Sequence, residues 1–316
     1  MKKMILNKDF VLKAVKSPFL IVAACLLAVF IGYKSFGSYK KHVKHSKGFS
    51  VDKITSKMRY RHAWDVMVTD EQKQKVDKIL DQPYFFLGKG KQCYAFESAD
   101  GKYVLKFFQH QRFEVKKVVT KFPDFFLSKR LVKYKRKNKK DKRDELFQSF
   151  LIAKELASES GVLFVHLNRT KKEYANLTVL DKKGKLFKIK LDDVQFVLQT
   201  KASLLKPILV QLMYEGKEEE AKKRISQIFE LLVKTAQNEV YDKDGALIRN
   251  NNLGFLGDHA IFIDTGKLVH KKEIAIRSVF AKSLKRLQPL HKWLKKNYPD
   301  LSEHFEEEKK EAIDSF

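Results

Sequence analysis

Residues 84–108 read YFFLGKGKQCYAFESADGKYVLKFF, and this stretch decides the fold of the chain. Apolar residues on both sides of Gly88 and Gly90 predict a strand, a glycine-containing turn and a second strand. A further turn at residues 99–102 leads into an apolar strand that Lys106 interrupts. Burying an ammonium against a sheet face is costly unless an anion meets it. Phosphate is a natural candidate, because glycines let backbone N–H groups approach phosphate oxygens closely.

A second motif lies far downstream, where residues 260–266 read AIFIDTG. This is a short buried-strand pattern that ends in Asp264, and a carboxylate at a strand end is well placed to hold a divalent metal. Asn252 precedes the neighbouring strand, and the turn at residues 257–258 joins the two strands. Carboxylate and amide oxygens on adjacent strands suit Mg²⁺, so Asn252 and Asp264 are the predicted metal ligands.

The two motifs together resemble the protein-kinase-like superfamily, in an atypical bacterial form. The resemblance covers residues 84–290 and implies an α+β, bilobal fold with a small antiparallel β lobe and a mainly helical lobe. It also implies ATP and Mg²⁺ as cofactors, with Gly88 and Gly90 over the nucleotide and Lys106 on its phosphates. Cys93 stands where the third glycine of the family's loop would fall, and Thr265 replaces the family's Phe after the metal-binding aspartate.

The catalytic loop departs from the family pattern. The resemblance places an aspartate five residues before Asn252, and that position is Leu247 in this chain. Asp242 and Asp244 are the nearby carboxylates, and either could act as base or metal ligand from a lengthened loop. Both could instead be solvated turn formers, which is common beside a glycine.

Glu145 is the predicted ion-pair partner of Lys106, with Glu155 as the second choice. Both lie in residues 144–158, whose apolar residues recur at helical spacing. The spacing to the next strand would place the ion-pair partner of Lys106 nearer to Ser149 than to either glutamate. Further secondary structure is expected as strands at 162–167, 177–180, 186–191 and 194–199, a hinge at 200–202, and helices at 204–214 and 218–238.

The N-terminal region contains an uncharged apolar run, at residues 17–33. At about 1.5 Å per residue, this run just spans a bilayer core, which predicts one transmembrane helix rather than a cleaved signal peptide. An ATP-dependent domain favours a cytoplasmic location for the C-terminal domain. The expected organisation is a basic segment (1–16), a transmembrane helix (17–33), a basic juxtamembrane linker (34–68), a β-rich lobe (69–200) and a helical lobe with metal-binding loops (201–316).

The net charge is +27, from 65 Lys and Arg against 38 Asp and Glu over 316 residues. Such a chain attracts polyanions generally, including anionic lipid and acidic protein. The charge is densest in a predicted basic insertion at residues 128–143, which is either a polyanion-docking loop or membrane-surface patch, or a solvated, partly disordered segment. Tyr134 is the one aromatic residue within it, so a base-stacking nucleic-acid site is not indicated.

Two functions remain open from sequence. The chain is either a membrane-anchored kinase that transfers the γ-phosphoryl of ATP to a hydroxyl, or a catalytically inactive pseudokinase that acts as a membrane-tethered scaffold for acidic partners or anionic lipid. Leu247 is the residue that separates the two, because it stands where the family has its catalytic aspartate.

Overall fold

The computed structural model describes residues 49–114, 129–181, 183–243, 252–270 and 276–315. It divides the chain into two compact units, Met1–Gly48 and Phe49–Phe316. The predicted membrane segment, residues 17–33, therefore lies outside the described residues. Among the residues that are described, no helix has both the length and the apolar character needed to cross a membrane.

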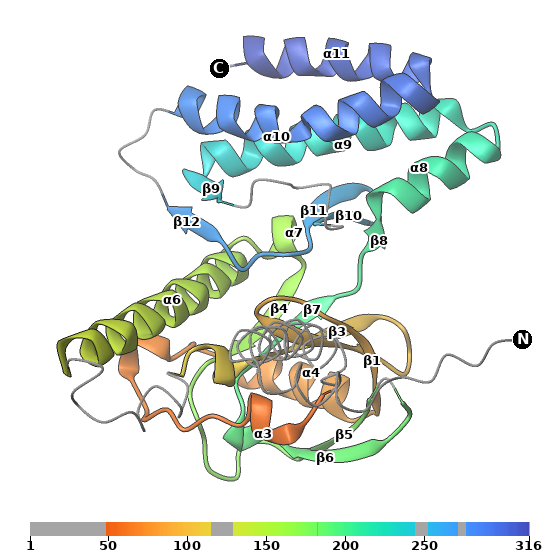
Figure 1. Cartoon of the computed structure of the whole chain (residues 1–316). Helices are drawn as coiled ribbons and strands as arrows, with labels where there is room; N and C mark the ends of the chain where they lie inside the picture. The colour runs from red at the N-terminus through yellow and green to blue at the C-terminus, as the bar shows by residue number, and fades with distance from the viewer. Residues whose placement is uncertain (1–48, 115–128, 182, 244–251, 271–275, 316) are drawn as a thin grey trace, which may run out of the picture. The chain divides into compact units, whose positions relative to one another are not determined.

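Phe49–Phe316 is an α+β unit whose first half is built on a seven-stranded sheet. The strand order is β4-β7-β3-β2-β1-β5-β6, with neighbours antiparallel except for the parallel pair β1 and β5 (Figure 1). The strands are β1 Tyr84–Lys89, β2 Cys93–Ser98, β3 Tyr103–Phe108, β4 Val162–His166, β5 Asn176–Leu180, β6 Leu186–Lys190 and β7 Phe196–Thr200. The hairpins predicted from residues 84–108 are confirmed.

Alternation along these strands produces two different faces. On one face, Tyr94, Phe96, Leu105 and Phe107 are fully buried and pack in one cluster with helix α4 (Asp70–Leu80). The opposite face carries the pair Ala95 and Lys106, which stand directly across from each other on β2 and β3. Both faces of the sheet are packed, because Phe108 and Val197 on the second face form a core cluster with α6 (Lys129–Glu155), and Lys106 lies on that second face.

The order Thr69-Asp70-Glu71-Gln72 resembles a capping box and predicts a helix start, and helix α4 begins there. Thr69 Oγ1 accepts a hydrogen bond from Gln72 N at 3.2 Å, and the Gln72 side chain accepts one from Thr69 N, which completes a capping box. The residues before it differ from the expected linker. Phe49 and Ile54, the latter at the end of helix α3 (Val51–Ile54), are buried in the sheet cluster, because their apolar side chains gain more from burial than from solvent exposure.

A single helix, α6 (Lys129–Glu155), replaces the expected basic insertion and the helix after it. Residues 129–143 are thus the first half of the helix whose second half was predicted from periodicity. The second half is buried through Leu146, Phe147, Phe150 and Ala153, and the short helix α7 (Ala157–Ser160) follows it. The charge of residues 129–143 suggested a loop. In the structure these residues continue the helix, because a helix that is already stabilised by its packed second half extends at little cost.

The second half of the unit is mainly helical. It contains α8 (Leu205–Tyr214), α9 (Glu218–Gln237), α10 (Ile276–Asn297) and α11 (Pro299–Asp314), the last three of which lie side by side (Figure 1). Their facing apolar side chains form one core. Two small sheets accompany the helices, one of β8 (Ser203–Leu204), β10 (Leu253–Leu256) and β11 (His259–Phe262), and one of β9 (Val240–Asp242) and β12 (Leu268–His270). Short 3₁₀ turns complete the described elements at His62–Trp64, His110–Arg112 and Leu191–Asp193.

Candidate functional site

Lys106 connects the large sheet to the segment that carries Asp264. Its Nζ donates a hydrogen bond of 2.6 Å to the carbonyl oxygen of Ile263, the residue before Asp264. The side chain is partly buried, and burial lowers the pKa of the ammonium, while the Asp264 carboxylate and the Cys93 thiol oppose that shift. An ammonium has three donors, and one backbone carbonyl satisfies only one of them. The site therefore suits an added anion.

The segment around Asp264 is fixed by strand pairing. Strands β10 and β11 form an antiparallel hairpin in which Leu253 stands opposite Phe262, and Ile263 N donates to Asn252 O at 2.8 Å. Asn252 is buried, whereas Asp264 is exposed just beyond β11. The pairing brings these two predicted metal ligands to neighbouring positions at one end of the hairpin.

The donor set of this end of the hairpin fits a hard divalent cation. An amide and a carboxylate offer oxygen atoms, and Mg²⁺ is commonly held by one or two such side chains with phosphates and waters at its other positions. Within the described ranges, no group of three or more His, Cys, Asp or Glu side chains could hold a metal by itself. Asn252 and Asp264 would thus hold Mg²⁺ together with a phosphate ligand.

The glycine-containing turn between β1 and β2 leaves space above its backbone. A Cβ built on Gly88 would meet no atom within 4 Å, and one on Gly90 would meet only Cys93 O, at 3.8 Å. Neither glycine has a positive φ. Packing therefore does not explain these two glycines. Gly88 follows a register irregularity in the pairing of β1 with β2, and close approach of a ligand to the backbone would also favour glycine here.

Gln109 holds this turn in place. Its Nε2 donates to Gly90 O at 2.9 Å and to Cys93 O at 3.2 Å, and its backbone N donates to Gln92 O at 2.8 Å. Gln109 is fully buried directly after β3. Sequence reasoning missed this residue, although a glutamine next to an apolar strand is a signal for a buried polar contact.

Gln92, at the end of the turn, reaches the Asp-Thr-Gly segment. Its Nε2 lies 3.4 Å from Gly266 O, and a Cβ on Gly266 would clash with Gln92 Oε1 and would lie 3.1 Å from Leu146 Cδ1. Gly266 therefore has a packing reason to be glycine in this chain. The contact joins the two motifs that the sequence analysis identified separately.

Ser149 occupies the position on α6 that faces the Asp264 segment. It is buried, its Oγ donates to Thr265 O at 2.5 Å, and the same Oγ accepts from Leu268 N at 2.5 Å. Glu145 is exposed on the same helix and forms no hydrogen bond or ion pair with the described residues. Glu155 lies beside His270 instead, with 3.3 Å between Oε2 and Nε2.

The expected ion pair of Lys106 with Glu145 is consequently not formed. Helix α6 buries the face that contains Leu146, Phe150 and Ser149, and this face turns Glu145 toward solvent. Ser149, the position that the spacing favoured, faces the Asp264 segment and has a hydroxyl group, not a carboxylate.

Cys93 lies in the same neighbourhood as Lys106. It stands where a third glycine was expected, and it pairs with Phe108 across β2 and β3. Burial raises the pKa of its thiol to about 12, although Lys106 acts in the opposite direction. The thiol is therefore neutral near pH 7 and is a poor nucleophile there.

Asp242 is held by a cation of the helical half. It is 6% exposed on β9, and Arg286 Nη1 on α10 lies 3.6 Å from its Oδ2. The Arg286 guanidinium also lies over the ring of Tyr241 and donates to its hydroxyl. Asp244, the alternative carboxylate, falls outside the described residues, as does Leu247. The described contacts thus give Asp242 a structural partner.

Gly254 marks the closest approach between the hinge and β10. A Cβ there would lie 2.5 Å from Ser203 O and 2.7 Å from Ile263 Cδ1. Strand β8 pairs with β10 through Gly254 and Leu204. Gln199, at the end of β7, adds a 3.4 Å contact from its Nε2 to Ile263 O. The predicted hinge at 200–202 therefore runs directly beside the Asp264 hairpin.

Comparison with known proteins found few similarities. No protein-family model matches the sequence, and no curated protein matches it. Among solved structures, one match is described as "Medium resolution structure of the bifunctional kinase- methyltransferase WbdD". It is 16% identical, has a TM-score of 0.32, and covers 69% of this chain and 43% of that chain. The match thus spans less than half of the length of that protein.

Proposed function

We propose that this chain has a kinase-like fold, binds ATP with Mg²⁺ beside Lys106 and Asp264, and transfers the γ-phosphoryl group to a hydroxyl acceptor. One observation carries the proposal: the 2.6 Å contact from Lys106 Nζ to Ile263 O joins the lysine of β3 to the strand end that bears Asp264. A lysine, a carboxylate and an open glycine turn in one place form a set of groups that suits a nucleotide triphosphate.

Each side chain has a separate task in this proposal. Lys106 binds phosphate oxygens with the ammonium donors that Ile263 O leaves free. Gly88 and Gly90 leave room for phosphate close to the backbone, although Gly90 N itself donates to Cys93 O at 2.9 Å. Asn252 and Asp264 hold Mg²⁺, which when bound neutralises charge on the phosphates. We assign Asp244 as the acceptor of the hydroxyl proton, because Arg286 already pairs with Asp242.

A second function, a nucleotide-binding pseudokinase, is favoured by one specific observation. Ser149 takes the position on α6 where an acidic partner of Lys106 was expected, and it binds backbone atoms of Thr265 and Leu268 instead. With Leu247 in place of the family's aspartate, phosphoryl transfer would depend on Asp244 alone. Binding without turnover is therefore the alternative to be tested.

The membrane location is also part of the proposal. The uncharged run at residues 17–33 supports a single anchoring helix, and ATP use supports a cytoplasmic position for Phe49–Phe316. The lysines on both sides of the run do not choose an orientation. The orientation is chosen from the need for ATP, which is available in the cytoplasm.

The test uses the purified full-length protein and measures Mg²⁺-dependent ATP binding by calorimetry, then phosphoryl transfer with labelled ATP. Lys106→Met should weaken ATP binding by about 10–100-fold, and Asp264→Asn should remove the dependence of binding on Mg²⁺. Asp244→Asn should keep binding and lose transfer. Lys102→Met is the matched control, because Lys102 is exposed directly before β3 and should leave both activities unchanged.

Three outcomes decide between the functions. Binding with transfer that Asp244→Asn removes would support the kinase. Binding by the unmodified protein without transfer to water, protein or small hydroxyl compounds would support the pseudokinase. No binding at millimolar ATP, with or without Mg²⁺, would refute both.

A further inference from the structure

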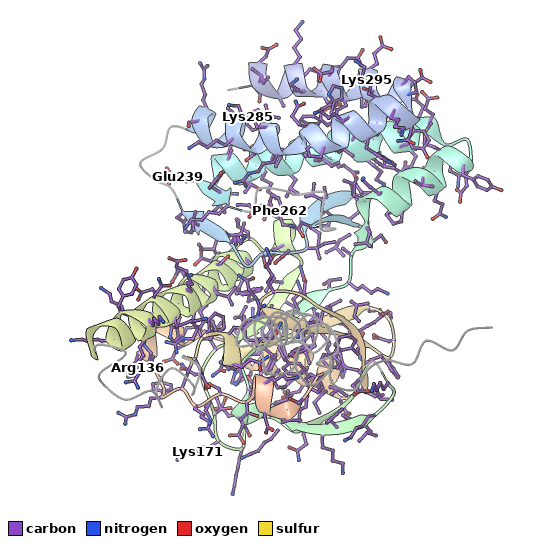
Figure 2. The ribbon with its side chains drawn as sticks, in the orientation of Figure 1. Arg136, Lys171, Glu239, Phe262, Lys285 and Lys295 are labelled. Atoms are coloured by element: carbon purple, nitrogen blue, oxygen red, sulfur yellow. The ribbon has the colours of Figure 1, made fainter. Side chains whose placement is uncertain are left out.

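The first half of α6, residues 129–143, is the most basic element of the described chain; we call it the basic half of α6. It contains ten Lys and Arg residues and one acidic residue, Asp141. Six of its cationic side chains are exposed: Lys133, Lys135, Arg136, Lys137, Lys140 and Lys142. Arg136, which Figure 2 labels, is one of these exposed residues.

These six cations have no partners within the described part of the chain. None of them forms a hydrogen bond or an ion pair there, whereas Lys139 donates to Arg112 O and Arg143 pairs with Asp144. Helix α9 is different, because its Lys222 pairs with Glu218 and Glu219 at helical spacing. In this respect the basic half of α6 differs from α9, whereas the exposed lysines of α10 (Lys285, Lys292, Lys295 and Lys296) also form no ion pair with a described residue.

Such a helix is electrostatically unfavourable by itself. Lys133 and Lys137, like Arg136 and Lys140, are four residues apart on the helix, where like charges repel. The packed second half of α6 propagates the helix through these residues, but the repulsion among their cations stays uncompensated within the described chain. An anionic surface would supply that compensation.

We propose that the basic half of α6 docks on the anionic headgroups of a lipid bilayer. Each Lys or Arg near such a surface gains attraction to it. The chain favours lipid over other polyanions, because it contains the apolar run 17–33 with Lys34, Lys40 and Lys41 directly after it. A chain held at a bilayer by that run would present α6 to headgroups at high effective concentration.

Nucleic acid fits the same surface less well. Tyr134 is the single aromatic side chain among the basic residues, so stacking on bases has one platform at most. The docking inference does not depend on phosphoryl transfer, because it uses no residue of the nucleotide site. It would stand if the domain proved to be a pseudokinase.

The experiment measures amide hydrogen exchange of residues 133–142 in the full-length protein, placed in nanodiscs of phosphatidylcholine alone or mixed with phosphatidylserine. Docking should slow exchange of this segment by about fivefold or more in the mixed discs, with reversal at high salt. This slowing of exchange should be lost in a variant with four substitutions, Lys133→Glu, Arg136→Glu, Lys137→Glu and Lys140→Glu. Its peptides from residues 146–153 report whether the helix is still folded.

The matched control makes the same change of charge on α10. Lys285, Lys292, Lys295 and Lys296 are exposed there, and Figure 2 labels Lys285 and Lys295. Replacing all four by Glu should leave the protection of α6 intact. Equal loss in both variants would mean that net charge and not α6 controls binding, which would overturn the proposal.

Two further results would also overturn it. One is equal exchange of residues 133–142 in neutral and anionic discs. The other is protection by single-stranded RNA with none by anionic lipid, which would assign the surface to nucleic acid. Failure of the chain to enter neutral discs would refute the anchor at 17–33 separately, and in that case sedimentation with the same mixed lipids as vesicles would test docking.

Discussion

Lys106 on β3 and Asp242 on β9 are both charged residues with little exposure, but only Asp242 has a partner of opposite charge at ion-pair distance. Asp242 meets a cation, Arg286, which is itself 11% exposed in its side chain and is further held by Tyr241. Lys106 meets a neutral carbonyl, Ile263 O, and among the described residues it has no carboxylate within ion-pair distance. One charge is neutralised within the fold and the other is not.

This difference shows why burial of a charge does not identify a functional residue by itself. A buried pair such as Asp242 and Arg286 can be purely structural, because each partner offsets the desolvation of the other. Lys106 forms no ion pair with a described residue, although the Asp264 carboxylate partly offsets the effect of its burial, and it lies two strands from Gly88 in the same sheet, where Gly88 and Gly90 leave open space. The uncompensated charge is the better indicator of a ligand site.

The largest expected effect comes from breaking the compensated pair. Arg286→Met should lower the free energy of unfolding by about 3–5 kcal/mol, because the Asp242 carboxylate loses its cation in a buried position. Chemical denaturation of the full-length protein measures the change. Asp242→Asn in the Arg286→Met background should recover part of the loss. Little change from Arg286→Met would mean that the pair is not structural, and Asp242 would return as a candidate base.

Replacing Lys106, which has no ion-pair partner, should affect ATP affinity more than stability. Lys106→Met removes a desolvated ammonium and should change the free energy of unfolding by less than about 1 kcal/mol. It should weaken ATP binding by about 10–100-fold, because a charged hydrogen bond is lost. Calorimetry and denaturation on the same samples test both parts. A large loss of stability with unchanged ATP affinity would contradict this prediction and would mean that Lys106 has a structural role.

A smaller effect is expected at Ser149, which connects α6 to the Asp264 segment. Ser149→Ala leaves Thr265 O and Leu268 N without their shared hydroxyl, and should cost about 1–2 kcal/mol of stability. ATP affinity should fall less than in Lys106→Met, because Ser149 positions the segment and does not contact the nucleotide in the proposed site. The exposed Gln148→Ala is the control on the same helix. Equal effects of the two variants would argue against a positioning role.

Much of the sheet could be predicted from local pattern. The alternation and the glycines of residues 84–108 gave three strands and two turns, and the Thr69 capping box gave the start of α4. These features depend on neighbours within a few residues, so sequence contains their cause. The prediction of the strand that contains Lys106 is confirmed for the same reason.

The predictions that failed involve choices that distant residues make. Glu145 was selected for its charge, but burial of Leu146 and Phe150 against the sheet decides which face of α6 turns inward. Residues 129–143 were expected as an insertion, and the packed second half of the same helix extends through them. Phe49 and Ile54 were assigned to a linker because basic residues surround them, yet they join the sheet core.

The sequence by itself determined the alternating strands, the glycine turn, the capped helix and the position of Lys106 within an apolar strand, because each follows from side chains close together in the chain. The tertiary structure decided that Lys106 reaches Ile263 O, that Gln92 meets Gly266 and that Arg286 pairs with Asp242. These contacts join residues that are from 44 to 174 positions apart. Contacts of that range depend on how the packed faces of the elements meet, and no local pattern specifies them.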